Sequence, residues 1–172
     1  MPNWCMNNLQ ITASKDQIKE IEQQLDHCEG KNFFDIFVPN SEEAGKGDDW
    51  YAYNCATYGC KWTCDASDWD VDGEGTTISI SFDSPWGPPE ELFSTISERY
   101  ESVLAYYYEP GMAFCGKFMD GYDECYEIPS SAEEIRDQIP AEIDDFFNIS
   151  EQMAEWEAEN EEEDDEDSEK TA

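Results

Sequence analysis

Polar and apolar residues alternate with a period of two at two places in the chain. Near the N-terminus this period puts four residues on one face, which are Cys5, Asn7, Leu9 and Ile11. It predicts a β-strand over Trp4–Thr12. A second strand is predicted over Thr76–Asp83, with Ile78, Ile80 and Phe82 pointing inward.

Further strands are predicted where short apolar runs meet turn residues. Residues 58–66 and 103–109 each predict a strand. Residues 112–119 and 122–128 flank Asp120-Gly121, the signal of a two-residue β-hairpin.

Two segments have the helical period instead. In the first, Ser14 and Gln17 have the spacing of a capping box and Gly30 ends the helix, whose apolar stripe is Ile18, Ile21, Leu25 and Cys28. In the second, Pro88 and Pro89 suit the first helical turn, and the buried face is Leu92, Phe93, Ile96 and Tyr100.

The remaining segments before residue 130 are less regular. Residues 33–38 (FFDIFV) are either a strand or a segment packed under the sheet. Residues 40–49 predict a loop, and residues 68–75 predict a turn rich in Asp and Gly. The element order predicts an α+β fold with its helices on one face of the sheet and an added β-hairpin.

The pattern changes after Pro129. Ser131 and Glu134 have capping-box spacing, Pro140 divides the following helix, and Ser150 is placed to cap a further turn. Beyond Glu159 the sequence has nothing to bury and predicts disorder. We therefore expect a folded domain over 1–129, an acidic helical extension over 130–158 and a disordered acidic tail over 159–172.

Charge dominates the composition. The chain has 43 acidic and 9 basic residues, for a net charge of −34, yet 39% of its residues are hydrophobic and 14% aromatic, enough for a core. Residues 1–130 hold 25 acids and 7 bases, and residues 131–172 hold 18 acids and 2 bases. This charge disfavours nucleic acid and anionic membranes as direct partners and favours basic proteins or divalent cations.

The N-terminal sequence lacks a basic region followed by a sustained apolar stretch, so no signal peptide is expected. No apolar run approaches the ~20 residues of a membrane span. The 7 cysteines are an odd number, which favours reduced thiols. We therefore expect the protein to be cytoplasmic and to have no cofactor.

Four motifs recur in the order of a known family. They are MPNWCMNNLQI at the N-terminus, YGCKW at 58–62, SPWGPP at 84–89 and EPGMAFCG at 109–116. Over residues 1–128 the chain resembles the YubB-type ferredoxin-like domain family of plasmid and bacteriophage proteins. The resemblance implies a ferredoxin-like antiparallel sheet and a mobile-element origin, but no reaction. One departure is Cys60, where relatives tend to have threonine.

The acidic residues with the most restricted positions are the first candidates for a binding site. We expect partner-binding carboxylates at Glu133, Glu134, Asp137, Glu142, Asp144, Asp145, Glu151, Glu155, Asp68, Asp70 and Asp72. Carboxylates on helices could repeat at spacings resembling a phosphate backbone, which carries a charge per ~1.7 Å of duplex axis. The alternative for the C-terminal acids is a solvated, solubilising surface.

Metal and catalytic sites are weaker interpretations of the sequence. Asp68–Gly73 begins like a calcium loop, but position twelve would be Ser79, so an acidic turn is favoured. Cys55, Cys60 and Cys64 lack the close pairs of structural zinc sites. His27, the single histidine, has no converging nucleophile.

The tryptophans of the motifs are Trp4, Trp62 and Trp86. Core packing is favoured for them over a ligand platform. Stacking of nucleic-acid bases would require nearby cations, and Lys61 is the only one close in sequence.

These patterns predict a non-enzymatic inhibitory protein of a phage or mobile element. As a nucleic-acid mimic it would occlude the basic DNA- or RNA-binding site of a host defence protein, such as a restriction or CRISPR system, in the host cytoplasm. The alternatives are a mobile-element adaptor with a solubilising acidic tail and a metal-binding protein.

Overall fold

The structure, a computed structural model, describes residues 3–38 and 49–170, with the backbone alone for 161–170. The chain divides into two compact units, Met1–Cys125 and Tyr126–Ala172. The sequence places the boundary four residues later, after residue 129. The predicted loop over 40–49 lies, except for Asp49, outside the described residues.

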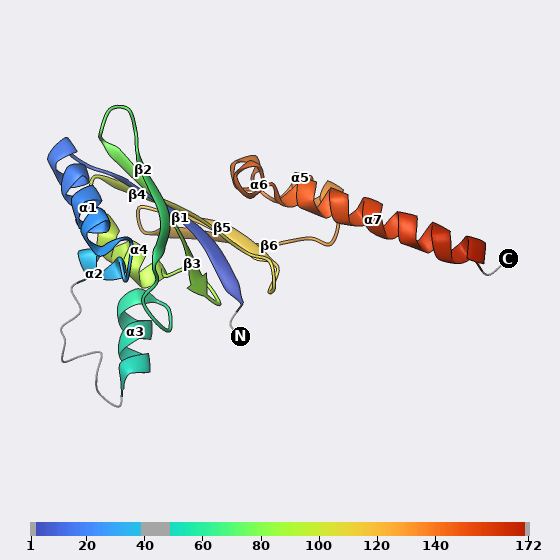
Figure 1. The fold of residues 1–172 in the computed structure, drawn as a ribbon, viewed down its shortest axis with the longest axis horizontal. Helices are drawn as coiled ribbons and strands as arrows, with labels where there is room; N and C mark the ends of the chain where they lie inside the picture. The colour runs from blue at the N-terminus through green and yellow to red at the C-terminus, as the bar shows by residue number, and fades with distance from the viewer. Residues whose placement is uncertain (1–2, 39–48, 171–172) are drawn as a thin grey trace. The chain divides into compact units, whose positions relative to one another are not determined.

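The first unit alternates strands with helices in the order βα–ββαβ, with a hairpin after it (Figure 1). Its elements are β1 (Trp4–Thr12), α1 (Lys15–Cys28), α2 (Phe34–Phe37), α3 (Trp50–Tyr58), β2 (Ala66–Val71), β3 (Thr77–Pro85), α4 (Glu90–Ser97), β4 (Ser102–Glu109), β5 (Phe114–Met119) and β6 (Tyr122–Glu127). The last strand runs across the boundary into the second unit.

The strands form one sheet in the order β2-β3-β1-β4-β5-β6. β1 lies between β3 and β4 and is antiparallel to both, so Leu9 is opposite Ile80 on one side and Ala105 on the other. The βαββαβ order with β1 central is that of a ferredoxin-like fold. The expected α+β class and the added hairpin are confirmed.

The core lies between one face of the sheet and the helices, as Figure 1 shows for α1 and α4. The predicted inward residues of β1 and β3 are buried, and so are the apolar faces of α1 and α4 except for Cys28 and Tyr100, which are half-buried. The capping box of Ser14 and Gln17 is present, and Glu29 and Gly30 end α1 with positive φ angles of 54° and 73°. These periodic segments match their predictions closely.

Within residues 33–38 the chain forms the short helix α2, Phe34–Phe37, rather than a strand. Phe33, Phe34 and Phe37 are fully buried, and both Phe33 and Phe34 contact the Phe82 ring, at centroid distances of 4.9 and 5.7 Å. The segment is therefore packed under the sheet, which is the second of the two interpretations of this apolar run.

The strand predicted over 58–66 is wrong. Residues 50–58 form α3, and Gly59 ends it with a φ of 80°. A Cβ at Gly59 would lie 3.0 Å from the Glu90 backbone nitrogen, so the chain passes closely over the start of α4. Residues 59–65 then form a loop, because this close approach and the left-handed glycine interrupt any ladder.

The predicted turn over 68–75 is shorter than expected. Asp68 and Asp70 belong to β2, opposite Ser81 and Ser79 of β3. The turn begins at Asp72, whose carboxylate accepts the backbone N–H groups of Thr76 and Thr77 at 2.7 and 3.1 Å. Those two hydrogen bonds lower the pKa of the Asp72 carboxyl.

The second unit contains α5 (Ala132–Gln138), α6 (Ala141–Phe147) and α7 (Ile149–Lys170). Ser131 caps α5 and Pro140 separates α5 from α6, as predicted. α7 begins before Ser150, whose N–H donates to the Asp144 carboxylate at 2.7 Å. The cap predicted at Ser150 is therefore supplied by Asp144.

Helix α7 differs from expectation in its length. Its backbone is helical to Lys170, although composition predicts a disordered tail after residue 158. Residues 159–170 contain no Gly or Pro, and glutamate has a high helix propensity, so nothing in the local sequence ends the helix.

The β5–β6 hairpin depends on a close approach between Gly116 and Tyr107. A Cβ at Gly116 would lie 2.2 Å from the Tyr107 hydroxyl oxygen and 2.4 Å from the Glu124 carbonyl oxygen. The Tyr107 hydroxyl in turn donates to Asp123 at 2.9 Å. We expect Gly116→Ala to lower the free energy of unfolding by about 1–3 kcal/mol, because the new methyl group forces these groups apart.

Urea denaturation measures this change, and Gly73→Ala is its matched control. A Cβ at Gly73 would meet no atom within 4 Å, so that variant should stay within about 0.5 kcal/mol of wild type. Equal stability of the two variants would contradict the close packing at Gly116.

Candidate functional site

All four sequence motifs converge at one end of the sheet. Trp4 of the first is opposite Pro85 of the third, and the Trp86 N–H donates to the Asn3 carbonyl at 2.9 Å. In the fourth, a Cβ at Gly111 would lie 2.8 Å from the Asn3 side-chain nitrogen. The second motif reaches the same place through its tryptophan.

Trp4, Trp62 and Trp86 form one aromatic cluster. The Trp62 ring lies 6.4 Å from the Trp4 ring and 5.7 Å from the Trp86 ring, in edge-to-face geometry. Trp4 is 48% exposed and Trp86 42% exposed, while Trp62 is half-buried. Core packing, the interpretation favoured by the sequence, is therefore wrong for Trp4 and Trp86.

A cation already contacts this cluster. The Lys61 ammonium lies 5.3 Å from the centroid of the Trp62 ring and 5.2 Å from that of Trp86. Both distances are within the ~6 Å range of a cation–π contact. Lys61, which is next to Trp62 in the sequence, is thus held between two indole rings.

The loop that carries Lys61 and Trp62 is fixed by buried thiols and amides. The Cys60 thiol contacts the Trp62 carbonyl oxygen at 3.2 Å, and the buried Cys64 thiol lies 3.7 Å from the same oxygen. The Asn54 side chain donates to the Lys61 carbonyl at 2.8 Å. These cysteines position the loop.

Trp86 has a backbone conformation that its residue type rarely adopts. Its φ is 65°, in the left-handed region, which costs on the order of 1–3 kcal/mol for a residue other than glycine. The hydrogen bond to Asn3 and that from the Ser84 hydroxyl to the Gly87 carbonyl, at 2.6 Å, hold the turn. Strain of this kind is found at functional sites.

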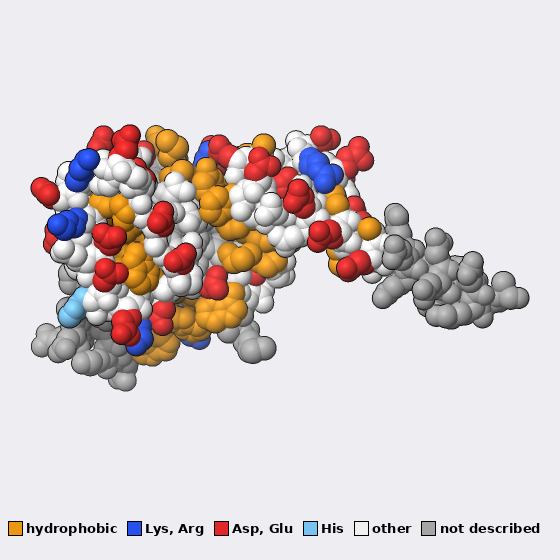
Figure 2. Space-filling view, turned by 45° about the horizontal axis from the view of Figure 1, so that its top comes forward, with side chains coloured by type: hydrophobic (Ala, Val, Ile, Leu, Met, Phe, Trp, Pro, Cys, Tyr) orange, Lys and Arg blue, Asp and Glu red, His pale blue; other side chains and the backbone are white. Residues whose placement is uncertain are grey.

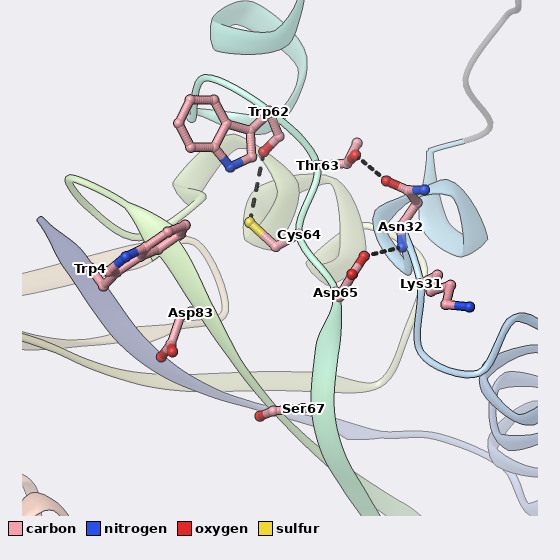
Figure 3. Close-up of a pocket in the computed structure, with 9 residues that line it drawn as sticks. All are labelled: Trp4, Lys31, Asn32, Trp62, Thr63, Cys64, Asp65, Ser67 and Asp83. Atoms are coloured by element: carbon pink, nitrogen blue, oxygen red, sulfur yellow. Dashed lines mark hydrogen bonds between the residues drawn. The ribbon is translucent and has the colours of Figure 1, made fainter. Parts of the chain in front are cut away.

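A pocket of about 540 Å³ lies beside Trp4 and Trp62. Figure 3 shows the two indoles with Asp83 next to Trp4, and Asp65, Asn32 and Lys31 on the opposite side. The Asn32 N–H donates to Asp65 at 2.8 Å, while Lys31 pairs with Glu29 at 3.2 Å.

Asp83 and Asp65 are the carboxylates of this pocket that the sequence analysis missed. Partial burial raises the pKa of the Asp83 carboxyl, and this carboxylate has no ion-pair or hydrogen-bond partner among the residues that the structure describes. The signal was present in the alternation of β3, which places Asp83 on the face opposite Phe82, directly before SPWGPP.

A second pocket of about 430 Å³ lies beside Trp86. Lys61, Trp86, Tyr107 and Glu90 line it, and partial burial raises the pKa of the Glu90 carboxyl. Each of the two pockets therefore adjoins a different part of the aromatic cluster.

The acids predicted in the first unit do not form one site. Asp68 and Asp70 are exposed on one face of β2, while the Asp72 carboxylate closes the following turn. Within the described residues, no three His, Cys, Asp or Glu side chains are placed to hold a metal ion. The calcium-loop alternative therefore has no support in the geometry.

In the second unit, most of the predicted carboxylates are exposed, namely Glu133, Glu134, Asp137, Glu142, Asp145, Glu151 and Glu155. Asp144 is the exception, because it is 7% exposed and caps α7. We therefore remove Asp144 from the expected binding surface. In Figure 2 the acidic side chains are spread over the viewed face of each unit with few bases among them.

Another missed contact lies within the second unit. The Glu157 carboxylate accepts the backbone N–H of Ala132 at 3.0 Å and so ties α7 to the start of α5. Glu157 has many acidic neighbours in the sequence, and only this tertiary contact distinguishes it from them.

The comparison with family models agrees with the fold. The family described as "Ferredoxin-like domain in Api92-like protein" matches residues 57–171. The chain belongs to this family. It is also similar to a solved structure of protein api92 from Yersinia pseudotuberculosis, with 12% identity and a TM-score of 0.45 over 76% of this chain and 99% of that one.

No curated protein matches the chain. Among the described residues, no helix is both long enough and apolar enough to cross a membrane.

The contact between Lys61 and the two indoles can be tested by substitution. We expect Lys61→Met to lower the free energy of unfolding by about 0.5–1 kcal/mol more than Lys31→Met, because both remove one positive charge but only the first removes a cation–π contact. Urea denaturation followed by tryptophan fluorescence gives the difference. Lys61→Arg should retain wild-type stability, and equal losses for the two methionine variants would contradict the contact.

Proposed function

We propose that this chain is a non-catalytic binding protein whose acidic C-terminal unit occupies the basic nucleic-acid site of another protein. The observation that carries the proposal is the charge along α7. This helix has 22 residues, 12 of them Asp or Glu.

The spacing of those charges resembles that of a nucleic acid. At a rise of ~1.5 Å per residue, α7 is ~33 Å long and carries one acidic residue per ~2.8 Å of axis. One strand of B-DNA carries one charge per ~3.4 Å. A cleft lined with Lys and Arg for a phosphate backbone therefore meets a comparable charge density along α7.

The rest of the second unit also favours a positively charged partner. Exposed acids on α5 and α6 add to those of α7, and Arg136 and Lys170 are the only bases among residues 131–172. Electrostatic attraction to a basic cleft would speed association and make it sensitive to salt.

The resemblance of the N-terminal motifs to YubB-type proteins supports a finer form of the proposal. The chain would then come from a phage or plasmid and act in the host cytoplasm. Its partner would be a host defence protein, such as a restriction enzyme or an RNA-guided nuclease, and inhibition would follow from competitive occlusion of the cleft.

A displacement assay tests the proposal. Purified restriction endonucleases and RNA-guided nucleases are each bound to fluorescent DNA, and the full chain is added as competitor. We expect displacement whose apparent affinity falls at least about tenfold between 50 and 200 mM salt, because each charge contact adds about one unit to the salt slope.

A triple variant assigns the effect to α7. Replacing Glu151, Glu155 and Glu159 by Gln keeps helix propensity but removes three charges, and should lower the salt slope by about 3. The matched control replaces Glu20, Glu98 and Glu101, which are exposed in the first unit. Displacement that is equal for both variants contradicts the proposal and favours the adaptor with a solubilising acidic region.

A further inference from the structure

The aromatic cluster offers two kinds of position for a cation. The position between Trp62 and Trp86 is filled by Lys61, at 5.3 and 5.2 Å from the ring centroids. Trp62 also meets Trp4, at an interplanar angle of 67°, and the pocket of about 540 Å³ lies beside this pair. Among the described residues, no basic side chain lies over the Trp4 ring.

The charged groups of this pocket are those that a cation requires. Asp83 lies beside Trp4 without an ion-pair partner among the described residues, and Asp65 faces it across the pocket (Figure 3). The one lysine of the lining, Lys31, is directed to Glu29 and is largely exposed. Two carboxylates and two indole rings therefore define the binding chemistry.

This combination disfavours an anionic ligand and favours a planar cation. A phosphate would face Asp65 and Asp83 with no free base in the lining, so nucleotides are disfavoured. A guanidinium group stacks on an indole face and donates two parallel hydrogen bonds to a carboxylate, whereas an ammonium is a strongly hydrated point charge. Indole and carboxylate side by side therefore suit arginine better than lysine.

We propose that the pocket formed by Trp4, Trp62 and Asp83 binds an arginine side chain of the partner protein. The inference rests on the proposed function for the identity of that partner, and it adds a second contact in the first unit. The acidic helix would supply attraction of low specificity, and the pocket would recognise one residue type.

Capped arginine, N-acetyl-arginine N-methylamide, is the probe, with capped citrulline as the uncharged control of nearly equal shape. The full chain, labelled with nitrogen-15, is titrated with each, and the indole N–H signals are followed by NMR. We expect saturable shifts at Trp4 and Trp62 with a dissociation constant on the order of 1 mM, and no saturable shift with citrulline. Trp156, which is 59% exposed on the acidic helix, reports any unspecific attraction.

Two variants assign the site. Asp83→Asn should weaken binding of capped arginine at least about fivefold, because the carboxylate partner is lost. Trp4→Leu removes one stacking surface and should weaken binding by about as much. Glu74→Gln is the control, since it removes one exposed charge from the turn that joins β2 to β3, and should leave the affinity unchanged.

Several results would overturn the inference. These are equal shifts with citrulline, parallel shifts at Trp156, or wild-type affinity in Asp83→Asn. Equal binding of capped lysine would remove the preference for guanidinium, and binding of agmatine but not of capped arginine would point to a free metabolite. A neutral sugar such as methyl glucoside shifting the same indoles would identify a carbohydrate site instead.

The outcome is separable from that of the proposed function. The triple glutamine variant of α7 should bind capped arginine as the wild type does, because its substitutions lie in the other unit. The pocket can thus be overturned while displacement of DNA persists, and displacement can fail while the pocket still binds arginine.

Discussion

Mutual repulsion among carboxylates is the constraint under which the whole chain folds. With 9 bases for 43 acids, at least 34 carboxylates have no base of their own. Apolar burial and the backbone ladder must therefore offset the repulsion. The central position of β1, hydrogen-bonded on both sides and fully buried at Leu9 and Ile11, shows where that stabilisation is concentrated.

The same constraint gives unusual weight to the few cations. Lys61 is held by two indole faces rather than by one of the abundant carboxylates. This arrangement orders the Trp62 loop without neutralising any acid. The aromatic cluster is therefore the part of the first unit whose chemistry differs most from the surrounding surface, and it is formed where Trp4, Trp62 and Trp86 come together from distant motifs.

The fold was largely predictable, because its main signals are local. The period of two in β1 and β3, the capping box at Ser14 and the Asp120-Gly121 turn each depend on neighbouring residues alone. The strand expected over 58–66 failed because a close approach between Gly59 and α4 determines that loop, and such contacts leave no periodic pattern. The site was less predictable for the same reason: Asp83 and Trp4 become neighbours only through the pairing of β1 with β3.

The direction of α7 has a consequence of its own. Asp144 and Glu157 anchor the N-terminal part of this helix. Its C-terminal end, which is the negative end of the helix dipole, contains the most acidic stretch of the chain. Acids at that end weaken a helix, whereas cations strengthen it. A positively charged surface that approaches the last turns would therefore stiffen them as it neutralises them, and contact and local order would rise together.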